Sequence, residues 1–92
     1  MSVSPNPAVG QAVFHYETNG TAQLLSAVLN IYSPQGALIT SIIPTVTSGS
    51  YVVGPVVWNL GGVTPGLYLA RMLVTDTQGH THQSTTKLIV QK

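Results

Sequence analysis

Apolar residues recur at every second position along most of this chain. From Leu67 to Asp76 the alternate positions read Leu, Leu, Arg, Leu on one side and Tyr, Ala, Met, Val on the other. A period of two places alternate side chains on opposite faces of a β-strand, whereas a helix needs a repeat near 3.6 residues. No segment has a helical repeat, and Val, Thr, Ile and Tyr suit a pleated sheet. The sequence therefore predicts an all-β protein.

Turn residues divide this pattern into short segments. Asn19-Gly20, Ser33-Pro34-Gln35-Gly36 and Gly79 each fit a tight turn between strands. The predicted strands cover residues 12–18, 23–32, 37–43, 51–58, 67–76 and 81–91, and a further short strand is open within 45–50. Six or seven antiparallel strands at this spacing predict one domain, residues 1–92, folded as an immunoglobulin-like β-sandwich.

The alternation also predicts which side chains form the core. Phe14 and Tyr16 share one face of their strand, and Trp58 is expected to be the large core residue that a sandwich needs. On the strand over 23–32, the predicted core face carries Leu25, Ala27, Leu29 and Ile31.

Two proline positions predict irregular or edge strands, because proline has no main-chain N–H to donate to a sheet. Gly54-Pro55 lies inside the strand over 51–58, where we expect a bulge or a sheet edge. Pro44 is expected to end the strand over 37–43 or to mark it as an edge.

Charged side chains are scarce, at 5% of the 92 residues against about 25% in an average soluble protein. With 43% hydrophobic residues and a net charge of +1, the chain is not of the disordered class. Two Lys and one Arg cannot form the basic stripe of a nucleic-acid-binding protein. Polar residues interrupt every run that could become a membrane-spanning helix, and no Cys is present to form disulfides.

Candidate catalytic or metal-binding groups are few. His15 and Glu17 share a strand face, as do His80 and His82 beside the Gly79 turn, but neither pair has an evident third partner. Gly61-Gly62 lacks the Lys and the helix start of a phosphate-binding loop. We expect this chain not to be an enzyme and to need no cofactor or metal.

Several short motifs occur in a recognisable order along the chain. Asn-Pro lies near the start, an aliphatic-Tyr pair precedes a turn Gly, a Trp precedes a loop that ends in Gly-x-Tyr, and a Lys-aliphatic strand ends the chain. This order resembles the C-terminal sorting domain of the type IX secretion system of Bacteroidetes. The matching residues are Asn6, Pro7, Ile31, Tyr32, Gly36, Trp58, Gly66, Tyr68, Lys87, Leu88, Ile89 and Val90.

Within that family the chain is most similar to the domain of the system's own gingipain-like sortase, a cysteine protease of the cell surface. It departs from the family in two ways. The loop over 59–64 after the Trp is shorter and not acidic, and Lys and Asp are fewer.

The resemblance implies a folded export signal and docking domain, cut from a larger secreted protein whose active site lies in another domain. Its implied partners are the type IX translocon and an outer-membrane shuttle β-barrel protein, which together bring the parent protein through the periplasm to the outer membrane and cell surface. Because a terminal strand has a reachable edge, we expect the partner to recognise Lys87, Leu88, Ile89, Val90, Gln91 and Lys92.

Two alternatives stay open at this point. Uncharged strand edges would also permit a homodimer of the isolated domain. An accessory β-sandwich for adhesion or carbohydrate binding would instead present exposed aromatic rings, because sugars stack on aromatic faces. The exposure of Trp58 distinguishes this second alternative from a docking domain.

Overall fold

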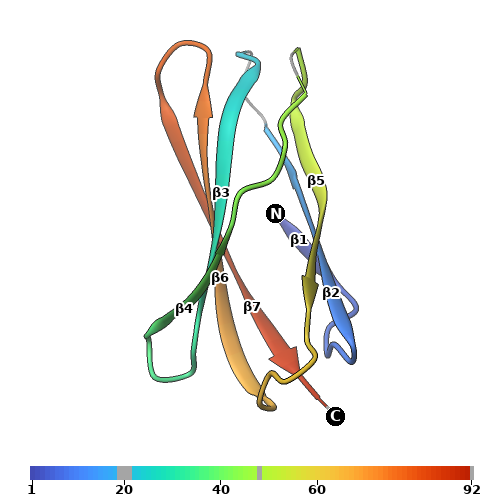
Figure 1. Cartoon of the computed structure of the whole chain (residues 1–92). Coiled ribbons are helices and arrows are strands. Elements are labelled where there is room, and N and C mark those ends of the chain that lie inside the picture. The colour runs from blue at the N-terminus through green and yellow to red at the C-terminus, as the bar shows by residue number, and fades with distance from the viewer. Residues whose placement is uncertain (19–21, 48, 92) are drawn as a thin grey trace.

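A computed structural model of the chain describes residues 1–18, 22–47 and 49–91 (Figure 1). The described residues contain seven strands and no helix, so the prediction of an all-β protein is confirmed. No described segment is therefore a helix that could cross a membrane. The strands are β1 (Ser2–Ser4), β2 (Gln11–Glu17), β3 (Leu24–Tyr32), β4 (Leu38–Ile42), β5 (Val52–Asn59), β6 (Gly66–Asp76) and β7 (Thr81–Val90).

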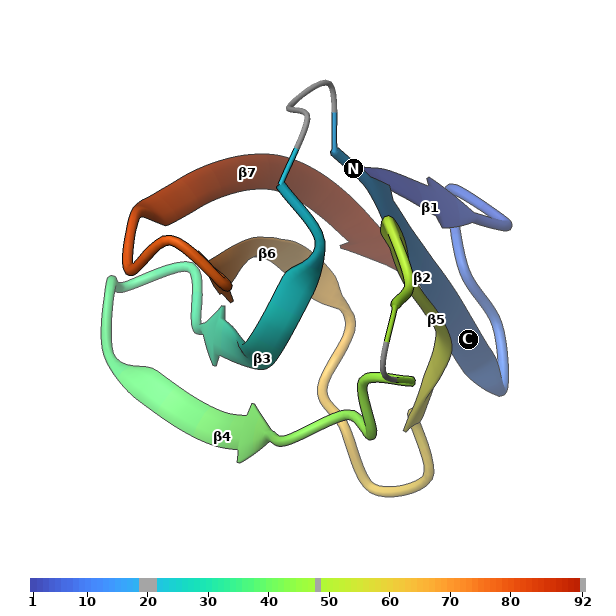
Figure 2. The ribbon, with the colours of Figure 1, turned by 90° about the horizontal axis from the view of Figure 1, so that it is seen from above.

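The strands form two antiparallel sheets that face each other. One sheet has the order β1-β2-β5, and the other has the order β4-β3-β6-β7. Figure 2 shows the four-stranded sheet curving around one side of the molecule and the three-stranded sheet closing the other side. This sandwich, 40 × 21 × 18 Å in extent, is compatible with the predicted immunoglobulin-like architecture.

Both ends of each of the six predicted strands agree with the structure to within one residue. β1 was not predicted, because its three residues are too short to show an alternation. The described residues of 45–50 form no strand, and the turn expected at Asn19-Gly20 lies outside the described residues. β4 is a sheet edge and ends at Ile42, shortly before Pro44, as predicted.

The prediction that Leu25 belongs to the core is wrong. Leu24 pairs with Asp76 and Ser26 with Thr75, so β3 holds one extra residue opposite β6. This bulge turns Leu25 outward, where it is 62% exposed, and leaves Leu24 in the core at 2%. Beyond the bulge the alternation recovers, and the predicted core residues Ala27, Leu29 and Ile31 are buried.

A second bulge lies in β5, where Gly54-Pro55 predicted a bulge or an edge. Phe14 pairs with Val56 and Tyr16 with Val53, so the Gly-Pro pair stands opposite a single β2 residue, and β5 is also a sheet edge. Gly54 has φ 128°, and a Cβ built on it would come within 2.8 Å of the Phe14 carbonyl oxygen. Only glycine fits this close approach of the two strands.

The core fills the space between the sheets. Phe14 and Tyr16 face it from β2, and Leu29 and Met72 face it from β3 and β6. Fully burying an aliphatic or aromatic side chain of this size stabilises a fold by about 1.5–3 kcal/mol. The sandwich is thus held mainly by apolar packing, in keeping with its few charges.

Candidate functional site

The motif residues that carry the family resemblance lie far apart in sequence but gather at one end of the sandwich. β3, β5 and β7 end there, and β2, β4 and β6 begin there. The chain leaves the sandwich at this same end, at the bottom of Figure 1. We call it the carboxy-terminal end.

Trp58 and Tyr68 pack edge to face across the carboxy-terminal end, with ring centroids 5.6 Å apart and an interplanar angle of 74°. The Tyr68 hydroxyl donates a hydrogen bond to the Thr64 carbonyl, as in the tyrosine corners of immunoglobulin-like sandwiches. Trp58 is 8% exposed, which confirms its predicted place in the core. A sugar-binding surface built on an exposed Trp58 ring is therefore not formed.

A tight turn between β3 and β4 lies on the same side of the sandwich as Tyr68, and both line one groove. The Gly36 N–H donates to the Ser33 carbonyl at 2.9 Å, and the Ser33 Oγ accepts from the Gln35 and Ala37 N–H groups. Gly36 has φ 87°, a conformation that favours glycine. The turn brings Pro34 against Gly66, where a Cβ would stand 3.3 Å from the Pro34 Cγ.

An open groove of about 420 Å³ lies between this turn and β7 on the outer face of the four-stranded sheet. We call it the outer groove. Sequence reasoning did not find it, because its residues come from three strands and one turn. Leu67, Leu69 and Arg71 of β6 contribute to its lining together with Tyr32, Pro34 and Lys87.

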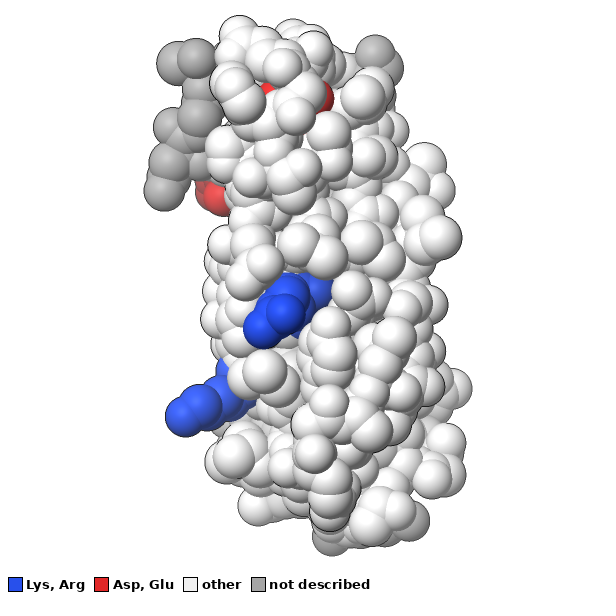
Figure 3. All heavy atoms as spheres, turned by 90° about the vertical axis from the view of Figure 1, so that its left-hand side faces the viewer, with Lys and Arg blue, Asp and Glu red and all other residues white. Residues whose placement is uncertain are grey.

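The outer groove is positively charged. The guanidinium carbon of Arg71 lies 5.6 Å from the centroid of the Tyr32 ring, and Arg71 Nε is buried with no hydrogen-bond partner among the described residues. The ion pairs of the described residues involve neither Arg71 nor Lys87. Figure 3 shows these cationic groups near each other on one face, with the acidic groups nearer the opposite end of the molecule.

The predicted recognition strand divides between core and surface. Leu88 and Val90 are buried between the sheets, whereas Lys87, Ile89 and Gln91 are exposed. Lys92 lies outside the described residues. A partner that contacts the folded domain can therefore reach only alternate side chains of this strand.

β7 is an edge strand of its sheet. The expectation that its edge is free is nevertheless wrong for residues 87–91. The Asn6 side chain donates from Nδ2 to the Lys87 carbonyl at 3.1 Å and accepts from the Ile89 N–H at 3.0 Å. Ala8 bonds to the main chain on either side of Val90, accepting from Gln91 and donating to Ile89. We call residues 6–8 the clasp, because they occupy the edge that a partner strand would need.

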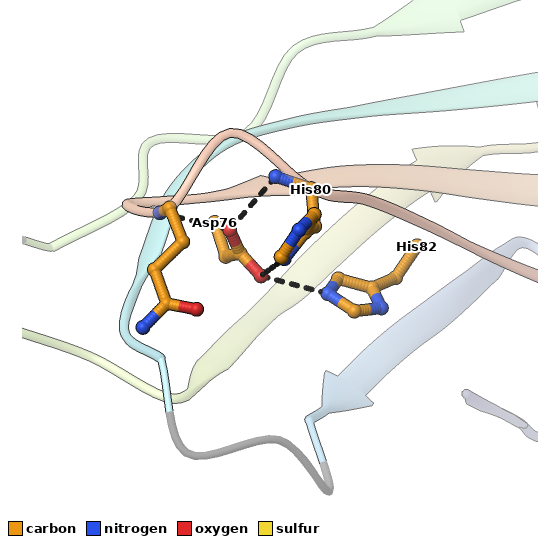
Figure 4. A network of polar contacts seen from close by, with 4 residues as sticks. Asp76, His80 and His82 are labelled. Carbon is orange, nitrogen blue, oxygen red and sulfur yellow. Dashed lines mark hydrogen bonds and ion pairs between the residues drawn. The ribbon is translucent and has the colours of Figure 1, made fainter.

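At the opposite end, Asp76 organises the β6–β7 hairpin (Figure 4). Its Oδ1 accepts the N–H groups of Gln78 and His80 at 2.9 and 3.0 Å, and its Oδ2 lies 2.9 Å from His82 Nε2 and 3.9 Å from His80 Nδ1. Sequence reasoning missed this carboxylate, although its spacing of four and six residues from the two His across a turn could have indicated it. The hydrogen bond with His82 lowers the pKa of Asp76 by more than burial raises it, and the two N–H groups lower it further.

The arrangement at Asp76 stabilises a turn. Both carboxylate oxygens already accept hydrogen bonds within the hairpin, and the described residues contain no group of three His, Cys, Asp or Glu side chains placed to hold a metal ion. His15 and Glu17, the other pair considered, are both exposed on β2, and no hydrogen bond or ion pair joins their side chains in the described part of the chain.

Comparison of the chain with protein-family models, with curated proteins and with solved structures found no significant match.

Proposed function

We propose that this chain is a C-terminal sorting and docking domain of the type IX secretion kind, without catalytic activity of its own. It would be recognised by the translocon and by an outer-membrane shuttle protein, and would place its parent protein at the cell surface. On this proposal the parent is sortase-like, with its catalytic residues in another domain. The single observation that supports it is the gathering of the motif residues at the carboxy-terminal end.

These motif residues have different structural roles at that one end. Asn6 belongs to the clasp, Gly36 forms the β3–β4 turn, and Trp58 packs on Tyr68. Together they shape the surface around the outer groove and the last strand. A signal that is read in the folded state needs such a surface, because its buried residues cannot be contacted.

The clasp bears on how a partner would bind. The clasp occupies the edge of the last strand, so a partner strand could pair with that edge only after the clasp is displaced. The exposed faces of Lys87 and Ile89 and the outer groove are open without any rearrangement. We therefore propose that recognition uses the outer face of the four-stranded sheet.

The proposal can be tested by fusing residues 1–92 to the carboxyl end of a folded, periplasm-directed reporter in a Bacteroidetes host. We expect the reporter to reach the cell surface in the wild-type strain and to stay in the periplasm when the translocon is deleted. A reporter that stays in the periplasm of the wild-type strain would refute the proposal, as would surface exposure that does not need the translocon.

A pair of matched variants then separates recognition from folding. Ile89→Asp puts a charge on the last strand, at a position that is 45% exposed, whereas Val57→Asp puts the same charge on the other sheet, at a position that is 50% exposed and paired with the uncharged Val13. Neither side chain belongs to the core, so both domains should melt close to the wild type. We expect Ile89→Asp to abolish capture by the shuttle protein and Val57→Asp to leave it intact. Equal capture of the two would contradict recognition through this face.

A further inference from the structure

We propose that the outer groove binds an extended peptide segment in which a carboxylate side chain is flanked by apolar residues. This inference rests on the proposed docking role and names the chemistry of the partner's segment. The register of the sheet, two cations without ion-pair partners among the described residues, and the apolar floor of the groove support it.

The register places Arg71 and Lys87 around one side chain, that of Leu69. Leu69 of β6 stands opposite Tyr32 of β3 and Lys87 of β7, which makes a row of three across the sheet. Arg71 lies in the next row on the same face, opposite Thr85. Diagonal neighbours on one sheet face lie about 7–8 Å apart, within reach of long side chains. One carboxylate above Leu69 can therefore contact both cations.

No acidic side chain of the described residues forms an ion pair with either of these cations. Its two acidic residues are Glu17, at the end of β2 in the other sheet, and Asp76, whose carboxylate already accepts hydrogen bonds in the hairpin. Among the described residues, Arg71 Nε is buried without a hydrogen-bond partner and the guanidinium takes part in no ion pair; its guanidinium carbon lies over the Tyr32 ring, which lines the outer groove. A guanidinium with unused donors pairs best with a planar carboxylate, which accepts two parallel hydrogen bonds. The complementary ligand is therefore a carboxylate.

The remaining lining indicates what adjoins that carboxylate. Leu67 and Leu69 are apolar, and Tyr32 and Pro34 add an aromatic and an apolar surface beside them. At about 3.3 Å per residue, the stretch from Leu67 to Arg71 is about 13 Å long, the length of about four extended residues. A small inorganic anion would leave this apolar length uncovered, whereas an extended peptide fills it. Two cations are also too few to hold an anionic membrane surface strongly.

The test is an NMR titration of the isotope-labelled 92-residue chain with two capped peptides, Ser-Ile-Glu-Val-Ser and Ser-Ile-Gln-Val-Ser. We expect the Glu peptide to shift the amide signals of Leu67, Leu69 and Lys87, and to bind about tenfold more tightly than the Gln peptide. Equal affinities would overturn the proposal. So would an absence of binding by the Glu peptide while inorganic phosphate or anionic phospholipid vesicles shift the same signals.

Two variants at one exposed position provide the matched control. Thr85→Glu places a carboxylate directly opposite Arg71, where it competes with the peptide, and Thr85→Gln has the same size without the charge. We expect Thr85→Glu to weaken binding of the Glu peptide by about tenfold and Thr85→Gln to leave it unchanged. If both variants bind as the wild type does, Arg71 is not part of the site and the proposal fails.

This experiment uses no secretion machinery, so its outcome is separate from that of the reporter assay. Export without peptide binding would refute the groove ligand alone. Peptide binding without export would refute the sorting role and leave the groove as a peptide site.

Discussion

The clasp gives the most direct prediction, because one side chain bridges the two ends of the chain. Asn6→Ala removes both hydrogen bonds from the Asn6 amide to β7, one to the Lys87 carbonyl and one from the Ile89 N–H. The clasp main chain keeps its own bonds through Ala8. We therefore expect the strand edge to loosen locally while the sandwich stays folded.

The size of the effect follows from the two bonds. An intramolecular hydrogen bond contributes about 0.5–1.5 kcal/mol net. Asn6 is exposed, so water replaces the lost partners in part and each bond counts near the lower value. We expect Asn6→Ala to lower the free energy of unfolding by about 1 kcal/mol in urea denaturation.

Amide hydrogen exchange separates this local effect from a global one. The Ile89 N–H points away from β6 and has the Asn6 side chain as its acceptor, so in Asn6→Ala its exchange should accelerate by about tenfold beyond any global change. The N–H of the neighbouring Leu88 faces β6 by the alternation of an antiparallel strand and reports global opening alone. Asn6→Asp keeps an acceptor oxygen and should leave Ile89 protected. If Ile89 and Leu88 respond alike to Asn6→Ala, the clasp is not an independent contact and the reasoning is refuted.

Three further predictions test the bulges and the hairpin. Leu24→Ala should lower the free energy of unfolding by about 2–3 kcal/mol because Leu24 is buried, whereas Leu25→Ala should lower it by less than about 0.5 kcal/mol because Leu25 is exposed. Equal losses would contradict the bulge in β3. Gly54→Ala should lower the free energy of unfolding by more than about 2 kcal/mol, because the alanine Cβ would meet the Phe14 carbonyl oxygen and the φ of this residue is strained for alanine. A urea midpoint equal to that of the wild type would contradict this. The lowered pKa of Asp76 stabilises the fold above the unfolded pKa of about 4, and this stabilisation is lost as the pH falls through the folded pKa. Between pH 7 and pH 3 the melting temperature of Asp76→Asn should therefore fall less than that of the wild type, and an equal fall would show that Asp76 does not contribute.

Fold class and most of the core were predictable from local pattern alone. The alternation in β2 placed Phe14 and Tyr16 on one face, and that in β6 placed Met72 on the same face as Tyr68, because a period of two fixes the side of the strand on which each residue lies. The structure buries both of these faces. Gly54-Pro55 indicated the β5 bulge, because that pair cannot continue a regular ladder. The bulge in β3 has no such residue, so the alternation was extended one residue too far and Leu25 was placed in the core.

The candidate site was the least predictable part of the molecule. The sequence predicted a role in recognition for Lys87, but it gave no indication of a role for Arg71. The contact of Arg71 with the Tyr32 ring joins residues that lie 39 positions apart in sequence, so local pattern does not reveal it. The same holds for the burial of Arg71 Nε without a partner among the described residues. The partnership of Asp76 with His82 likewise depends on the closure of the hairpin.

Local sequence established that this chain forms strands and where six of the seven strands lie, and it contains short motifs in an order that resembles that of a sorting domain. Those features are local, since they depend on neighbouring residues and on turn chemistry. The closing of the last strand's edge by residues 6–8 is a tertiary contact, as is the meeting of Arg71, Tyr32 and Lys87 in one groove. These contacts depend on which strands pair and in what register. A period of two tells which side chains share a face of a strand, but it does not determine which strand lies beside it.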